Sequence, residues 1–133
     1  MLQGVILILF CTCSVYANGV LLKGWMIMVI IETSIFTNII QGLLSDEEYA
    51  SFQEVLVCDP KCGSVIKGSG GLRKIRWKIA GKGKRGGARV VYYYLDQEDQ
   101  IYMLYAYQKN KQGDLTNQQV KQLKAMVMQE INT

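Results

Sequence analysis

The amino-acid sequence contains no histidine among its 133 residues. Histidine is the side chain used most often as a general acid or base, and it is also the commonest metal ligand. Every mechanism for this chain therefore has to assign those roles to other groups. The length is sufficient for one domain that buries its own core without help from metals or disulfides.

Acidic residues are missing from the whole interval between Asp59 and Asp96. The same interval holds ten cations, in a chain whose formal net charge is only +4. They are Lys61, Lys67, Arg73, Lys74, Arg76, Lys78, Lys82, Lys84, Arg85 and Arg89. A solvated surface normally mixes both signs of charge, whereas a field of one sign attracts polyanions. The predicted ligand is nucleic acid.

The acid-free interval also has internal order. Residues 72–79 alternate, which places two sets of side chains on opposite faces of an extended chain. One face carries Arg73, Ile75, Trp77 and Ile79, and the other carries Leu72, Lys74, Arg76 and Lys78. The glycine-rich segment 81–87 is predicted to be a loop whose backbone can approach a phosphate chain. A second strand then begins at Arg89 and extends to Leu95.

Three helices are predicted from apolar spacing and capping residues. Apolar side chains recur at three- and four-residue spacing over 35–43, and the Asp-Pro pair at 59–60 ends a second helix. Two capping boxes mark helix starts: Ser45 with Glu48, and Thr116 with Gln119. Between helix and basic strand, residues 60–71 are expected to form a loop that Val65 and Ile66 pin to the core.

Further strands are predicted at 28–32 and 101–108, on either side of the basic region. The order of elements is then strand, helix, helix, three strands and helix. This order predicts an α+β domain, with a small, mostly antiparallel sheet, two N-terminal helices and a C-terminal helix. The loop at 109–114 is expected to return Lys109 and Lys111 to the same end of the sheet as the glycine-rich loop.

The first 25 residues differ from the rest. They contain an apolar run that no lysine or arginine precedes and that is too short to span a bilayer. All eleven carboxylates and fourteen of the fifteen cations come after Met26. We interpret 1–25 as an apolar extension, from a start codon assigned too early or from a signal-like segment, and 26–133 as the functional domain.

No metal site or cofactor is expected. Four cysteines, Cys11, Cys13, Cys58 and Cys62, lie in two unrelated regions without a histidine to complete a zinc site. The acids Asp96, Glu98 and Asp99 are expected in a polar turn away from the basic face, so that no magnesium site is predicted.

Several of these segments together resemble the HigB branch of the RelE toxin family. The motifs that carry the likeness are Leu72-Arg73-Lys74-Ile75-Arg76, Gly81-Lys82-Gly83-Lys84-Arg85-Gly86-Gly87-Ala88-Arg89, the strand Val90 to Leu95 and Gln108-Lys109-Asn110. The likeness extends from about residue 28 to residue 131, and the glycine-lysine-arginine block is its most specific part. The first 25 residues have no counterpart in the family.

The resemblance implies a cytoplasmic, ribosome-dependent mRNA endonuclease of a toxin–antitoxin module, which inhibits translation by cutting the message in the vacant decoding site. It also implies a cognate, HigA-like antitoxin with a helix-turn-helix, contact with operator DNA only through the antitoxin complex, and no membrane partner. By motif position, Lys74 and Arg76 correspond to paired cations on the family's second strand, and Arg89 to the arginine that opens the third. Lys109 matches a basic position after the last strand, whereas Asn110 replaces a family arginine.

The chemistry of RNA cleavage divides these residues into two groups. Attack of the ribose 2′-hydroxyl on its phosphate needs a base, charge stabilisation and a donor for the leaving oxygen. A lysine crowded by other cations loses its proton more readily, whereas arginine stays charged. The expected catalytic residues are therefore Arg76 and Arg89, which hold the phosphate, with Lys82 or Lys84 as base or acid. Expected RNA-binding residues are Arg73, Lys74, Arg85, Lys109, Lys111 and Tyr93, the last by stacking on a base.

Two other interpretations remain open at the level of the sequence. A basic strand and loop also serve a non-catalytic module that binds RNA or the ribosome. A secreted or membrane-associated basic protein is the third class, and it depends on the first 25 residues being part of the protein.

Overall fold

The computed structural model describes residues 5–17, 20–79 and 87–132, with side chains from residue 28 onward. In chain order the elements are β1 (Val5–Ala17), β2 (Val20–Glu32), α1 (Ser34–Leu43), α2 (Asp46–Cys58), β3 (Ser64–Val65), β4 (Arg73–Trp77), β5 (Ala88–Leu95), η2 (Asp96–Glu98), β6 (Gln100–Gln108) and α3 (Asn117–Ile131). The predicted α+β class, with two N-terminal helices and one C-terminal helix, is confirmed.

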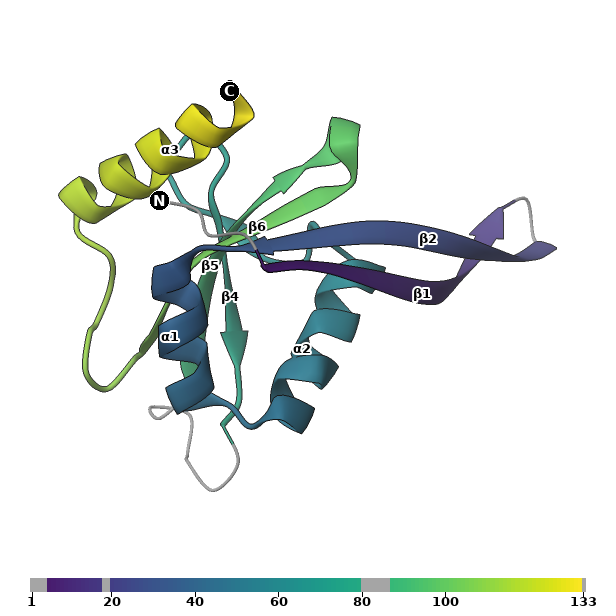
Figure 1. Ribbon diagram of the computed structural model, residues 1–133, viewed down its shortest axis with the longest axis horizontal. Coiled ribbons are helices and arrows are strands. Elements are labelled where there is room, and N and C mark those ends of the chain that lie inside the picture. Colours follow the sequence, from purple (N-terminus) through teal and green to yellow (C-terminus); the bar gives the residue numbers. More distant parts are fainter. Residues whose placement is uncertain (1–4, 18–19, 80–86, 133) are drawn as a thin grey trace.

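The strands form one six-stranded sheet in the order β1-β2-β6-β5-β4-β3. All neighbouring pairs are antiparallel except β2 and β6, which run parallel from Val29 opposite Gln100 to Glu32 opposite Met103. β1 and β2 make a long hairpin that projects from the side of the sheet (Figure 1). β2 passes through residue 26, where the sequence predicted the boundary of the functional domain.

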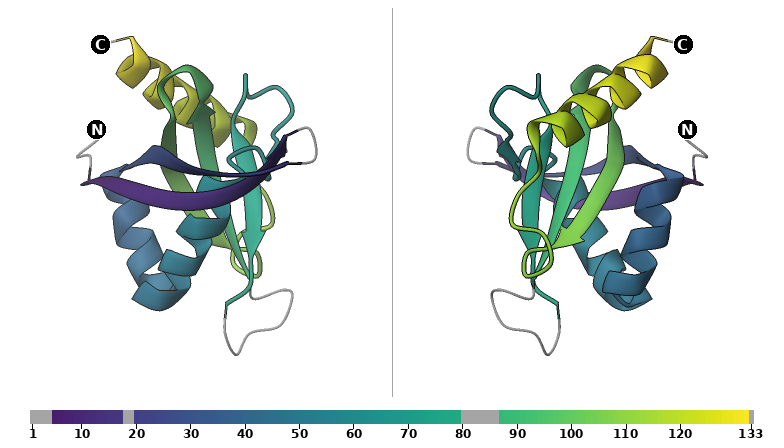
Figure 2. Two further views of the ribbon diagram at one scale, coloured as in Figure 1. Left: turned by 90° about the vertical axis from the view of Figure 1, so that its right-hand side faces the viewer. Right: turned by 90° about the vertical axis from the view of Figure 1, so that its left-hand side faces the viewer.

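Helices cover both faces of the sheet (Figures 1 and 2). α1 and α2 cover one face through a buried cluster that includes Phe36, Phe52, Val90 and Met103. α3 covers the other face, where Val127 is fully buried in a second cluster. The remaining core members of that second cluster, called here the α3 cluster, are Leu72, Val91, Tyr102, Leu104, Tyr107, Val120 and Leu123.

The helix starts follow the capping chemistry predicted from the sequence. Both capping boxes are present: Ser45 accepts from the Glu48 amide, and Thr116 accepts from the Gln119 amide, each with the reciprocal bond. Thr33 caps α1, and its hydroxyl also donates to the Leu104 carbonyl at 3.0 Å. The Thr33 cap therefore also ties the start of α1 to β6.

The expectation for the 60–71 loop is half confirmed. Ile66 packs against the α3 cluster, but the side chain of Val65 is 56 % exposed. Ile66 directly follows β3, whose two residues, Ser64 and Val65, are both exposed. The loop is held instead by Tyr92, whose hydroxyl donates to the Pro60 carbonyl and accepts from the Gly63 amide.

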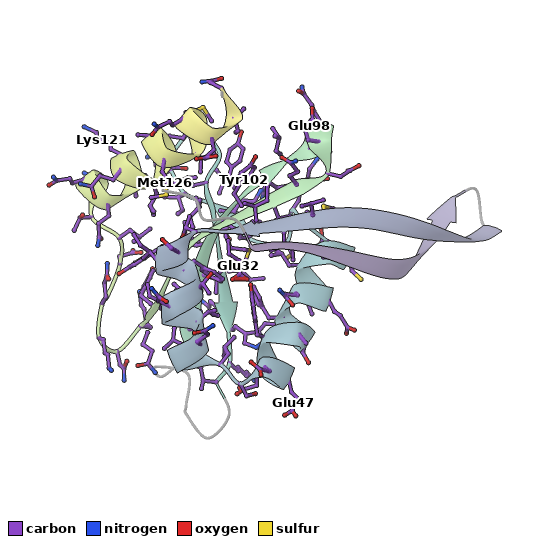
Figure 3. All side chains as sticks on the ribbon, in the orientation of Figure 1. Glu32, Glu47, Glu98, Tyr102, Lys121 and Met126 are labelled. Atoms are coloured by element: carbon purple, nitrogen blue, oxygen red, sulfur yellow. The ribbon has the colours of Figure 1, made fainter. Side chains whose placement is uncertain are left out.

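A buried carboxylate joins β2 to both N-terminal helices. Glu32 is 3 % exposed and lies beneath the sheet, between α1 and α2 (Figure 3). Its two oxygens accept from the Thr37 hydroxyl at 2.8 Å and from the Tyr49 hydroxyl at 2.6 Å. Burial, and then the adjacent carboxylate, raise the pKa of Tyr49 well above its usual range. The hydroxyl therefore remains a donor to Glu32 at any ordinary pH.

We predict that Tyr49→Phe destabilises the fold, because a buried carboxylate oxygen loses its partner. The expected loss in the free energy of unfolding is about 1.5–3 kcal/mol, as for hydrogen bonds to charged groups. Tyr94→Phe is the matched control, since its hydroxyl bonds the exposed Asp96, and it should change stability by about 0.5 kcal/mol or less. Urea unfolding measures both; equal losses in the two variants would contradict the assigned role of Glu32.

Candidate nucleic-acid interface

Arginine and lysine side chains line one face of β4 and β5. Ile75 and Trp77 pack with the α1–α2 cluster, so the alternation of the strand turns Lys74 and Arg76 to the opposite face. This confirms the predicted division of residues 72–79. Arg76 lies directly opposite Arg89 in the antiparallel pair, and opposite side chains have Cβ atoms about 5 Å apart. Lys74, Arg76 and Arg89 are called here the cationic strip.

Arg89 is the least exposed member of the strip. It is 8 % exposed, and Nη1 donates to the Ala88 carbonyl at a long 3.4 Å. Among the described residues no carboxylate forms an ion pair with it. Arg76 is exposed, so the strip presents one buried and one accessible guanidinium. A buried charge without a counter-ion is costly, and like charges directly opposite each other destabilise a sheet. A bound anion would relieve both costs.

Two tyrosines extend the strip on β6. Tyr107 lies opposite Arg89, and its ring stacks on that of Tyr105 with centroids 6.0 Å apart. The Tyr107 hydroxyl is buried and makes no hydrogen bond within the described part of the chain. Burial raises the pKa of Tyr107, the nearby Asp114 raises it further, and Arg89 lowers it. The pKa of Tyr107 therefore lies above its ordinary value. The hydroxyl stays protonated at neutral pH, which excludes it as a general base.

The segment between β6 and α3 runs back along the sheet beside β4 (Figure 2), where its Asp114 contacts Lys74 of the strip. Its Lys109 amide donates to the Gly87 carbonyl at 3.3 Å, which confirms that this loop meets the sheet where β5 begins. The Lys109 ammonium donates to the Gly113 carbonyl, and Lys111 is exposed. Both predicted cations thus lie on the segment that borders the strip.

Asp114 brings a carboxylate into this basic face. Its Oδ1 accepts from Lys74 Nζ at 3.1 Å. The hydrogen bond and the charge of Lys74, followed by the charge of Lys109, hold the pKa of Asp114 below its ordinary value. Asp114 was not predicted from the sequence, because it lies outside the acid-free interval and 40 positions from its partner. No local pattern in the sequence indicates the contact.

A groove of about 260 Å³ adjoins the Lys74–Asp114 pair. It lies between the 65–67 segment and the start of α3, and its lining is mixed: Val65, Ile66, Lys67, Lys74, Asp114, Leu115, Asn117 and Val120. The groove therefore adjoins the strip at Lys74 and has a second lysine, Lys67, in its lining.

The structure places two predicted RNA-binding residues away from the strip. Arg73 points to the opposite face, where Nη1 donates to the carbonyls of Gly63 at 2.7 Å and Lys61 at 3.2 Å. Tyr93 packs beside α3, with the Lys124 ammonium 4.9 Å from its ring centroid. The predicted residues Lys82, Lys84 and Arg85 lie outside the described residues.

The described residues contain no cluster of acidic and cysteine side chains suited to a metal ion. Within residues 5–17, 20–79 and 87–132 there is no group of three acids or cysteines that could hold a metal ion. Asp96 and Glu98 lie in η2, at the far end of the β5–β6 hairpin, as the sequence predicted (Figure 3). Over the same residues, none of the helices has the length and apolar character needed to cross a bilayer.

The fold is a basic α+β domain whose sheet carries a strip of three cations on one face. A sequence model described as RelE toxin of the RelE / RelB toxin-antitoxin system matches residues 64–132, more than half of the chain. The chain therefore belongs to the RelE toxin family. It is a toxin of a toxin–antitoxin system that acts on translation, and its partner is a cognate antitoxin. The matched range contains β3 to α3, and with them the whole strip and Asp114.

We predict that Lys74→Met raises the pKa of Asp114 toward its unperturbed value of about 3.9. In the unmutated chain the lowered pKa means that the ion pair stabilises the folded state above about pH 4, and that this contribution is lost as pH falls through the lowered value. The contribution of this ion pair to the free energy of unfolding is small, because 66 % of the Asp114 side chain is exposed.

A carboxyl-detected NMR titration measures the midpoint of Asp114 in each variant. Lys121→Met, which removes an exposed cation from α3, is the control and should leave the midpoint unchanged. An Asp114 midpoint that does not respond to Lys74→Met would show that the pair does not persist in solution.

Proposed function

We propose that this chain is a ribosome-dependent mRNA endonuclease of the HigB branch, which stops translation by cutting the message in the decoding site. The observation that carries the proposal is the buried Arg89, which lies opposite Arg76 and pairs with no carboxylate among the described residues. Its position in the family-matched half of the chain supports the same conclusion, because RelE-family toxins are generally endoribonucleases.

In the proposed reaction the 2′-hydroxyl of one nucleotide loses its proton and attacks the phosphate that joins it to the next. The bond from phosphorus to the 5′-oxygen of the next nucleotide breaks, that oxygen takes up a proton, and a 2′,3′-cyclic phosphate remains. Negative charge accumulates on the phosphorane oxygens, and preorganised donors aimed at that charge supply much of the rate enhancement in such reactions. Arg76 and Arg89 would bind those oxygens from neighbouring strands. We propose that the reaction needs no metal ion, because the two guanidinium groups supply the positive charge.

Proton transfer has to come from another group, because arginine stays charged and cannot exchange a proton at neutral pH. Tyr107 is unsuitable as a base, since its pKa is raised. We assign the roles of base and acid to Lys82 or Lys84, which the sequence places between the two strands of the strip. Lys74, Lys109, Lys111 and Arg85 would bind flanking phosphates.

The proposed partners are the ribosome with its message and a HigA-like, helix-turn-helix antitoxin. Operator DNA would be contacted only through the antitoxin complex. For the antitoxin, complementarity of charge suggests acidic residues facing the strip, since a basic face steers and orients an acidic partner. For the message, phosphate contacts from single lysines fix position without reading sequence.

We predict that Arg89→Met lowers the rate of message cleavage by about 100- to 1,000-fold, the usual effect of removing one donor to a developing oxyanion. Methionine keeps much of the buried volume of the side chain, so the circular dichroism spectrum should be unchanged. Cleavage is measured on a translated message with the purified full chain, and Lys121→Met serves as the control with unchanged activity.

Two results would contradict the proposal. An unmutated chain that binds programmed ribosomes but leaves the message intact would be a non-catalytic ribosome-binding module. Full cleavage by the Arg89→Met variant would remove this residue from the site.

A further inference from the structure

A carboxylate within a basic phosphate-binding face needs a reason, because it repels the same anion that its neighbours attract. Asp114 lies in such a place. Its carboxylate contacts Lys74 directly, and it is close enough to Tyr107 to raise the pKa of that hydroxyl. Asp114 therefore contacts the strip itself and is not a remote surface charge.

The fold holds Asp114 in position through the start of α3. The Gln112 side chain donates from Nε2 to the Asp114 carbonyl at 3.2 Å and to Gln119 Oε1 at 2.9 Å. The same Gln119 oxygen accepts from the Thr116 amide at 2.9 Å, as part of the capping box of α3. The backbone at Asp114 is thus tied to a capped helix that packs on the sheet, and its place beside Lys74 is built into the structure.

Lys74 is the member of the strip that most needs an anchor. A lysine ammonium sits on a flexible four-carbon stem, whereas a guanidinium is planar and better preorganised. Lys74 lies two residues before Arg76 on the same face of β4, and both are cations. Repulsion from Arg76 and Arg89 would move an unanchored ammonium out into solvent. Asp114 accepts a hydrogen bond from it at 3.1 Å and keeps it on the face.

We propose that Asp114 is a positioning residue of the RNA-cleaving site, which holds the Lys74 ammonium where it binds a phosphate next to the scissile one. The proposal rests on the proposed function. It predicts that removing the carboxylate raises the affinity for RNA and lowers the cleavage rate. The carboxylate opposes the arrival of an RNA phosphate, but the lysine that it orients contributes only when correctly placed.

The test compares Asp114→Asn and Asp114→Glu with the unmutated full chain. For Asp114→Asn, affinity for programmed ribosomes should rise roughly threefold, because one repelling charge is removed. The single-turnover cleavage rate at saturating ribosomes should fall about tenfold, because a binding group is misplaced. Asp114→Glu keeps the charge and should recover part of the rate.

Asp96→Asn is the matched control, because Asp96 pairs with Lys61 at 3.8 Å in another exposed lysine–aspartate pair. Asp96 follows β5 at the end opposite Arg89, a distance of roughly 23 Å along the strand. This variant should change neither affinity nor rate. A cleavage rate for Asp114→Asn that is unchanged or higher would overturn the proposal, since Asp114 would then only shield the site. Equal losses of affinity and rate with a lower melting temperature would also overturn it, and would indicate a structural role.

A second measurement does not depend on cleavage. In the ¹⁵N-lysine-labelled full chain, the Lys74 ammonium signal should show restricted motion that Asp114→Asn removes and Asp96→Asn preserves. If the unmutated chain cleaves no message, the proposed function fails, and this NMR comparison still tests the inference. A Lys74 signal equally mobile in all three proteins would overturn the positioning role even if cleavage is observed.

Discussion

The site depends on two guanidinium groups that face each other across β4 and β5. Arg76 and Arg89 are directly opposite in an antiparallel pair, and the one nearer the core is buried without an ion pair among the described residues. Like charges at such positions weaken a sheet. The rest of the domain has to tolerate that cost, and we propose that the phosphate of the message is the anion that removes it. The two arginines that are proposed to bind the phosphate thus destabilise the folded chain while no anion is bound.

The sheet tolerates this pair because its other contacts are strong. Tyr92 and Phe52 are fully buried on the α1–α2 side, and Val127 of α3 is fully buried on the other. α3 covers the apolar half of one face of the sheet. The segment leading to α3 borders the other half of that face, which carries the strip. The same capping box that begins α3 also anchors Asp114 through Gln112. The helix that completes the core therefore also places a charge in the site.

Local patterns were sufficient to predict much of this structure. Alternation over 72–79 correctly separated Ile75 and Trp77 from Lys74 and Arg76, and capping residues located the helix starts. These signals work because each depends on neighbours within a few positions along the chain. They indicated the fold class and the face that carries the cations.

What local patterns could not supply depends on contacts between distant segments. The approach of Asp114 to Lys74 follows from the path of a long connection. The packing of Tyr93 beside Lys124 follows from where α3 lies on the sheet. Arg73 shares a face with Ile75 and Trp77, as alternation predicted, but only the position of the 61–63 loop shows that its guanidinium binds backbone carbonyls. The parallel pairing of β2 with β6 and the burial of Glu32 are non-local in the same way.

The central claim is that Arg76 and Arg89 bind one RNA phosphate together. A 2′-O-methyl oligoribonucleotide, which lacks the attacking hydroxyl, can be titrated into the ¹⁵N-arginine-labelled full chain while the side-chain signals are followed by NMR. We predict that the guanidinium signals of both arginines shift together along one binding curve, while the Arg73 signal stays in place. If the Arg76 and Arg89 signals shift with different affinities, or if the Arg89 signal does not shift at all, the two arginines do not share a phosphate and the account is contradicted.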